Sequence, residues 1–150
     1  MTSTIESLQK LLLRDLDSLA KEISLFPTEE SLWLLQGDIK NTAGNLCLHL
    51  CGNLQHFIGT VLGQTGYVRN REAEFADKNV PKEKLLAEVE ATKKAVSQTL
   101  AKLDVAALQK EYPIQVFGEP MTTEYFLIHL AGHLNYHKGQ INYHRRILAG

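Results

Sequence analysis

One stretch near the C-terminus decides the fold: residues 129–144 read HLAGHLNYHKGQINYH and hold four of the six histidines. On a helix, at about 100° per residue, these histidines and Gln140 fall within one sector of about 80°. The neighbouring sector is apolar and contains Leu130, Leu134, Ile141 and Leu148. Because an apolar stripe is buried against other elements, the histidines are expected at the edge of a core, where each neutral imidazole needs a partner.

The same pattern occurs in a second predicted helix, from about Thr42 to Leu62, which Gly63 ends. Asp38 or Asn41 is its expected N-cap. His49 begins the polar edge of this helix, with Asn53 and His56 on the same side. The apolar stripe beside that edge contains Leu46, Leu50, Leu54, Phe57 and Val61.

Two more helices complete the prediction. The first begins at a capping box formed by Ser3 and Glu6, and Pro27 ends it near Phe26. The other begins at Pro81. Their apolar faces are Ile5, Leu8, Leu12, Leu16, Leu19 and Ile23 in the first, and Leu85, Val89, Thr92, Val96, Thr99, Leu100 and Leu103 in the other. Four long helices with connections of more than about ten residues predict a single all-α domain over residues 1–150, a four-helix bundle.

The connections carry weaker signals. Residues 64–81 are predicted to form a loop, either functional or a plain surface crossing. Arg69 and Arg71 in this loop suit two roles: clamping a substrate carboxylate, or pairing with Glu72 or Glu74. Residues 104–121 are expected to hold a short helical turn and then an extended segment over 112–120, and Thr122 or Thr123 is expected to cap the last helix.

Composition excludes several classes of protein. The formal net charge is −1, so no basic field attracts nucleic acid or an anionic membrane. No apolar run approaches the roughly 20 residues of a membrane span, and the N-terminus lacks the features of a signal peptide. We therefore expect a cytoplasmic protein. Cys47 and Cys51 lie four residues apart, which on a helix suits a disulfide poorly; the two are either small buried side chains or a metal or redox pair.

The histidine spacing favours a transition-metal site. Two histidines at i and i+4 on one helix face can hold a divalent metal, and the candidate pairs are His129/His133 and His133/His137. A third ligand must come from another helix, and His49 or His56 can supply it. The alternative is a set of surface or hydrogen-bonded core histidines, which is the interpretation we adopt for His144 and His56.

The two histidine segments resemble the motifs of the DinB-like and YfiT-like superfamily of metalloenzymes. Residues 133–141, HLNYHKGQI, are similar to its last-helix signature, and His49-Leu50 is similar to its first histidine motif. The loop from Thr65 to Phe75 is similar to that of an uncharacterised subgroup. The resemblance implies a four-helix bundle with a long crossover, usually dimeric. It also implies a metal bound by His49, His133 and His137, with His129 and His56 outside the ligand set.

This resemblance suggests a function as well. The superfamily includes transferases of low-molecular-weight thiols, so our first interpretation is a metal-dependent thiol transferase that acts on a small-molecule electrophile, with zinc or nickel as the expected metal. Gln140 and Asn53, each beside a predicted ligand, are candidates to orient a ring or contact substrate. Lys138 occupies a position where the family commonly has arginine. The alternatives are a non-catalytic metal-binding stress-response module and a metal-dependent hydrolase.

Overall fold

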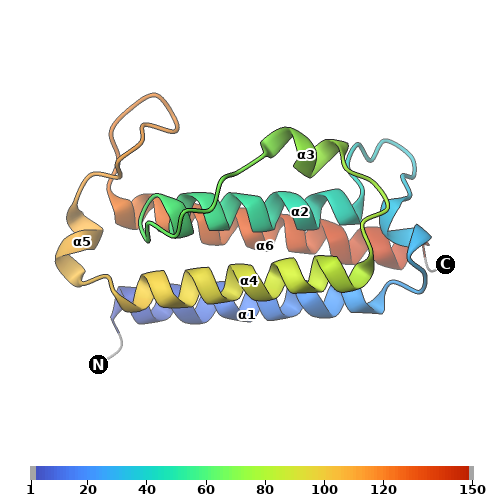
Figure 1. Cartoon of the computed structure of the whole chain (residues 1–150), viewed down its shortest axis with the longest axis horizontal. Coiled ribbons are helices and arrows are strands. Elements are labelled where there is room, and N and C mark those ends of the chain that lie inside the picture. The colour runs from blue at the N-terminus through green and yellow to red at the C-terminus, as the bar shows by residue number, and fades with distance from the viewer. Residues whose placement is uncertain (1–2, 149–150) are drawn as a thin grey trace.

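Four long helices lie side by side in the computed structural model, which describes residues 3–148 (Figure 1). They are α1 (Thr4–Leu25), α2 (Ala43–Leu54), α4 (Lys82–Ala101) and α6 (Thr123–Leu148). Around the bundle, α1 packs against α4 and α6, and α2 packs against the same two helices. The predicted all-α four-helix bundle is confirmed.

The helices form where their apolar residues recur at helical spacing. In α1 the side chain of Ser3 accepts a hydrogen bond from the backbone nitrogen of Glu6, as the capping box predicts. All six predicted apolar positions of this helix are buried. Removing an aliphatic side chain of this kind from water contributes about 1.5–3 kcal/mol. The apolar stripes therefore provide most of the driving force for the bundle.

A long crossover sets the order of the helices. Figure 1 shows α2 and α4 running in the same direction, so the chain must return along the length of the bundle between them. The return passes through residues 61–81 and includes the short helix α3 (Arg71–Ala76), which packs on α2. The crossover implied by the family resemblance is thus present, and it carries a helix over the outer side of α2.

The structure corrects several local predictions. Thr42, not Asp38 or Asn41, caps α2 by accepting from the backbone nitrogen of Asn45. The predicted second helix is continuous but changes at Gln55–Thr60 into the π-helix η2, which the apolar pattern does not distinguish from an α-helix. Part of the predicted loop 64–81 is helical, because Asn70 caps α3.

The remaining connections are irregular and contain short helices. A 3-10 helix, η1 (Glu30–Trp33), lies between α1 and α2, and α5 (Val105–Gln109) provides the predicted helical turn before α6. The segment 112–120 is made of turns and is not extended; its ends are held by an isolated bridge between Glu111 and Thr122. Among the helices of residues 3–148, none is long and apolar enough to cross a membrane.

Candidate metal centre

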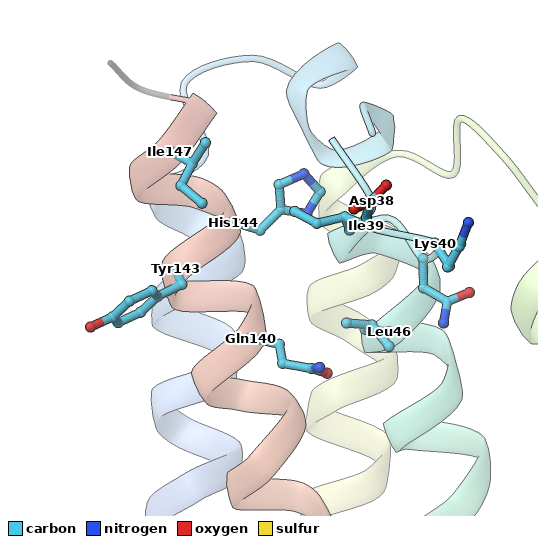
Figure 2. A pocket seen from close by; sticks show the side chains of 9 residues that line it. Asp38, Ile39, Lys40, Leu46, Gln140, Tyr143, His144 and Ile147 are labelled. Atoms are coloured by element: carbon cyan, nitrogen blue, oxygen red, sulfur yellow. The ribbon is translucent and has the colours of Figure 1, made fainter. Parts of the chain in front are cut away.

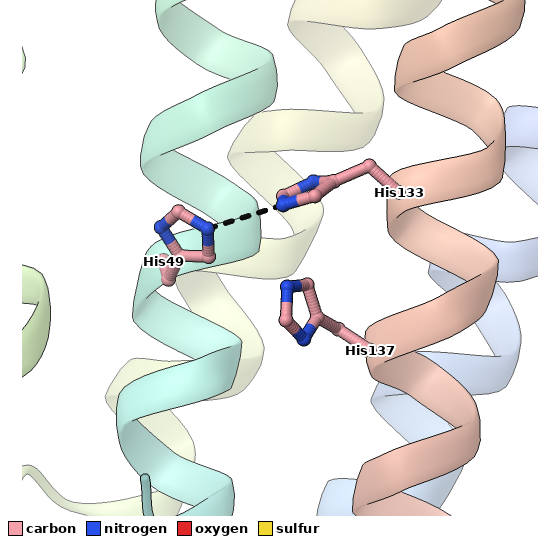
Figure 3. A group of neighbouring side chains, drawn as sticks. All are labelled: His49, His133 and His137. Carbon is pink, nitrogen blue, oxygen red and sulfur yellow. Dashed lines mark hydrogen bonds between the residues drawn. The ribbon is translucent and has the colours of Figure 1, made fainter. Parts of the chain in front are cut away.

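Three histidines converge between α2 and α6. His49 points from α2 toward His133 and His137, which lie one turn apart on α6 (Figure 3). The three rings offer one nitrogen each, and these nitrogens all lie within 4.8 Å of one another. His49 is buried, while His133 and His137 are half-buried. These are the three residues that the family resemblance selects; the structure brings them together between two helices, and their binding of a metal stays a prediction.

One pair of nitrogens in the cluster has the spacing expected at a tetrahedral metal. The Nε2 atoms of His49 and His133 are 3.3 Å apart. Two nitrogens that bind one ion at about 2.05 Å with a tetrahedral angle lie roughly 3.3 Å from each other. Three neutral imidazoles leave a fourth position open, which is typical of catalytic zinc sites. The residues therefore fit a divalent transition metal.

His49 is oriented by a buried ion pair. Its Nδ1 lies 3.1 Å from Oε1 of Glu74, which is carried by α3. Arg69 holds the same carboxylate with two hydrogen bonds, 2.8 Å from Nε to Oε2 and 2.9 Å from Nη2 to Oε1. Burial alone would raise the pKa of Glu74, but hydrogen bonds from His49 and Arg69 hold it below its usual value. The carboxylate is therefore ionised and accepts a hydrogen bond from His49.

His137 is oriented by a neutral, exposed partner. Its Nδ1 lies 2.6 Å from Oε1 of Gln140 and donates to it when protonated, which leaves Nε2 for the cluster. The amide of Gln140 also donates to the hydroxyl of Tyr136 at 3.3 Å. Gln140 thus takes the ring-orienting role predicted for it, although its contact with substrate stays a prediction.

The environment of His133 keeps its imidazole ring neutral. Burial, together with the nearby histidines, lowers the pKa of His133 to about 4. Within residues 3–148 no protein group pairs with its buried Nδ1. The ring is therefore neutral near pH 7, the form that binds metal.

A cavity of about 260 Å³ opens beside His49 and His133. Aromatic side chains form much of its wall: Phe57, Phe117 and Phe126. The other predicted contact residue, Asn53, also lines the cavity, but its Oδ1 is buried without a partner in the described chain. The cavity therefore places aromatic side chains, together with Arg69 and Arg71, beside two of the three clustered histidines.

The remaining histidines lie outside the cluster. His129 is exposed and stacks on Phe126 with ring centroids 5.8 Å apart. His56 packs edge-on against Phe57 at 4.8 Å. His144 is buried and lines a separate hollow at the far end of α6, between that helix and residues 38–41 (Figure 2). Burial lowers its pKa, and its Nε2 has no partner in the described chain, so it is neither the surface nor the hydrogen-bonded residue that the sequence predicted.

Three further residues singled out in the sequence have structural roles. Cys47 and Cys51 are buried and free, and their mutual hydrogen bond together with burial raises the pKa of the Cys47 thiol, which makes them small core side chains. Lys138 turns away from the histidines, and its Nζ lies 3.4 Å from Oδ1 of Asp15 on α1. Lys138 therefore braces α6 against α1 and does not face the cavity.

From the sequence, Arg69 had two predicted roles: clamping a substrate carboxylate, or forming a surface salt bridge with Glu72 or Glu74. The pairing is confirmed, but it is buried and acts on His49. Arg71 instead lies over the ring of Phe75, 5.3 Å from its centroid. The sequence contained one signal for this role: Gly52, a residue unfavourable in a helix, lies three positions after His49. In the structure, a side chain at position 52 would collide with Glu74.

The four-helix bundle with its long crossover is a DinB-like fold. The fold is similar to that of a DinB-like protein from Bacillus cereus ATCC 10987, with a TM-score of 0.72, 20% sequence identity, and coverage of 90% of this chain and 86% of that chain. The model of the family described as "Protein of unknown function (DUF1572)" matches residues 3–150, so the chain belongs to that family. No curated protein matches the chain.

Proposed function

We propose that the protein is a metal-dependent enzyme that transfers a low-molecular-weight thiol to a small electrophile, with His49, His133 and His137 as the metal ligands. The observation that carries this proposal is the convergence of the three histidines beside a cavity with a partly aromatic wall. A divalent transition metal held by three neutral imidazoles would supply a full double charge that lowers the pKa of a thiol in the open coordination position. Zinc and nickel suit the ligand set best.

The chain's own residues prepare the site for this chemistry. Glu74 and Gln140 fix the orientation of two rings, so each directs Nε2 toward the shared centre. Phe57 and Phe126 pack edge to face with centroids 5.1 Å apart and give the cavity a rigid apolar wall. Such a wall suits the organic body of an electrophile and limits water around the sulfur. In the transfer, the thiol proton passes to water at the cavity mouth and the sulfur forms a bond to the electrophilic carbon, which displaces a leaving group.

A thiol and electrophile panel tests this function. Protein purified without a nickel column and loaded with zinc or nickel should consume thiol and electrophile in equal amounts, and His133→Ala should lose this activity. The matched control is His144→Ala, which removes a buried imidazole of the same helix that lies outside the cluster and lines a separate hollow. Turnover without any added thiol would instead favour hydrolysis, and tight metal binding without turnover would favour a non-catalytic metal-binding module.

We also propose that the protein acts as a homodimer, as the family resemblance implies. Trp33 covers the core, but Leu25, Leu34 and Leu35 remain about half exposed around the same connection. Exposed apolar side chains of this size are typical of surfaces that meet a partner. Light scattering should give twice the mass of 16.8 kDa, and a monomeric mass would refute the proposal.

A further inference from the structure

The buried acid on α3 calls for an explanation, because burying a carboxylate is costly unless it is paired. Glu74 is 6% exposed, although it lies on a six-residue helix in the crossover. Its backbone is anchored on α2: the side-chain amide of Asn45 donates to the carbonyl oxygens of Glu74 and Asp77 at 2.9 and 2.8 Å. The carboxylate is thus delivered to α2 by a segment that α2 itself holds in place.

Gly52 provides the space for this carboxylate. A Cβ atom at position 52 would lie 1.9 Å from Oε2 of Glu74 and 2.6 Å from its Cδ. Glycine is unfavourable in the interior of a helix, and the conformation of Gly52 is ordinary helix, so it provides space and not an unusual backbone conformation. A side chain at this position cannot coexist with the observed carboxylate.

The hydrogen-bond geometry assigns the proton of His49. Arg69 Nη2 also lies 3.4 Å from Nδ1 of His49, but its shorter contact is to Glu74 at 2.9 Å. An ionised carboxylate only accepts, so the 3.1 Å contact requires a proton on Nδ1. The lone pair of His49 is then on Nε2, the nitrogen that faces His133.

We propose that Glu74 is a positioning residue that fixes His49 in the Nδ1-protonated tautomer and directs Nε2 toward the other two histidines, while Arg69 and Gly52 hold the carboxylate in place. A partner of this kind sets the ring orientation of a metal-ligating histidine and raises its basicity. This inference rests on the metal-binding part of the proposed function and does not depend on thiol transfer.

Zinc affinity tests the proposal on the full chain. Competition with a chromophoric chelator should show affinity lowered about 10–100-fold in Glu74→Ala and in Gly52→Ala, the second of which displaces the carboxylate without changing it. Glu74→Gln should fall between these variants and the wild type, because an amide oxygen still accepts but carries no charge. Gly139→Ala is the matched control, since a Cβ there meets nothing within 4 Å, and its affinity should not change.

The tautomer of His49 gives a readout that needs no metal. In the apo protein at pH 7.5, nitrogen-15 NMR should show His49 protonated on Nδ1 in the wild type and shifted toward Nε2 protonation in Glu74→Ala. A wild-type His49 protonated on Nε2, or folded Glu74→Ala and Gly52→Ala variants with wild-type zinc affinity, would overturn the proposal. If the wild type binds no zinc but has the expected tautomer, the metal-binding proposal fails and the assignment of the His49 proton stands.

Discussion

His49 and His137 perform the same task in the cluster, but they are supported in opposite ways. His49 donates to a buried carboxylate that is neutralised by an arginine, whereas His137 donates to an exposed neutral amide one turn along its own helix. A charge-assisted hydrogen bond in a dry environment is stronger than one between neutral groups at the surface. The ligand on α2 is therefore supported by a distant segment of the chain, whereas the ligand on α6 is supported by a residue three positions away.

The largest expected effect is the loss of a ligand on either side. Alanine at His49, His133 or His137 should reduce bound zinc to background, because two imidazoles do not make a stable site on their own. Metal analysis after dialysis against a weak chelator measures this. The controls are His129→Ala and His144→Ala, which leave the cluster complete and should keep one zinc per chain. Equal loss of zinc in all five variants would mean that the site is elsewhere.

The pH dependence should be the next largest effect. Imidazole binds metal only when neutral, and an unperturbed histidine has a pKa of about 6.5, so zinc affinity should fall as the pH drops from 7 toward 5. Because the pKa of His133 is about 4, that ring is already neutral at pH 5 and releases no proton. We therefore expect fewer than three protons released per zinc at pH 5, measured by calorimetry in buffers of different ionisation enthalpy. Release of three would contradict the burial of His133.

The lowered pKa of His133 should also make the stability of the metal-free protein depend on pH. The pKa of His133 is lower in the folded chain than the unperturbed value of about 6.5, so the unfolded chain takes up the proton first. The stability that comes from a neutral His133 is therefore present above pH 6.5 and is lost as the pH falls toward 4. Thermal melting in the presence of a chelator should show a lower Tm at pH 5 than at pH 7.5. Added zinc should raise the Tm at pH 7.5 and have little effect near pH 5. An equal Tm in all four conditions would refute both pH predictions.

Removing Gln140, the exposed partner of His137, should lower zinc affinity less than removing Glu74, the buried partner of His49. In Gln140→Ala, His137 loses a neutral partner, and water can replace it because Gln140 lies at the surface. We expect zinc affinity to fall less than in Glu74→Ala, at the lower end of the roughly 10–100-fold range for such partners. The chelator competition assay gives both values. A larger loss in Gln140→Ala would reverse the comparison between the two ligands.

Sequence periodicity predicts what depends on local spacing. The four long helices and the contact between His137 and Gln140 follow from residues three or four positions apart. The support of His49 does not, since Glu74 is 25 residues away and reaches it through a crossover whose path the periodicity does not specify. The π-helix η2 was also missed, because its six residues are too few for periodicity to distinguish them from an α-helical turn. The candidate ligands themselves were selected by the family motif, because spacing alone left His129 and His56 as alternatives.

The smallest expected effect is the change in the free energy of unfolding when Gly139 on α6 is replaced by alanine. Gly52 and Gly139 lie in helix interiors three and two residues after their respective ligands, but only Gly52 faces another side chain. Alanine is better than glycine in a helix by about 0.5–1 kcal/mol, and the new Cβ of Gly139→Ala meets open space. Gly139→Ala should therefore raise the free energy of unfolding by up to about that amount, whereas Gly52→Ala should lower it because the displaced carboxylate leaves Arg69 unpaired. Urea unfolding of both variants in chelator measures the two signs. A destabilised Gly139→Ala would show that this face of α6 is covered in solution, which light scattering on the same samples would then detect as loss of the dimer.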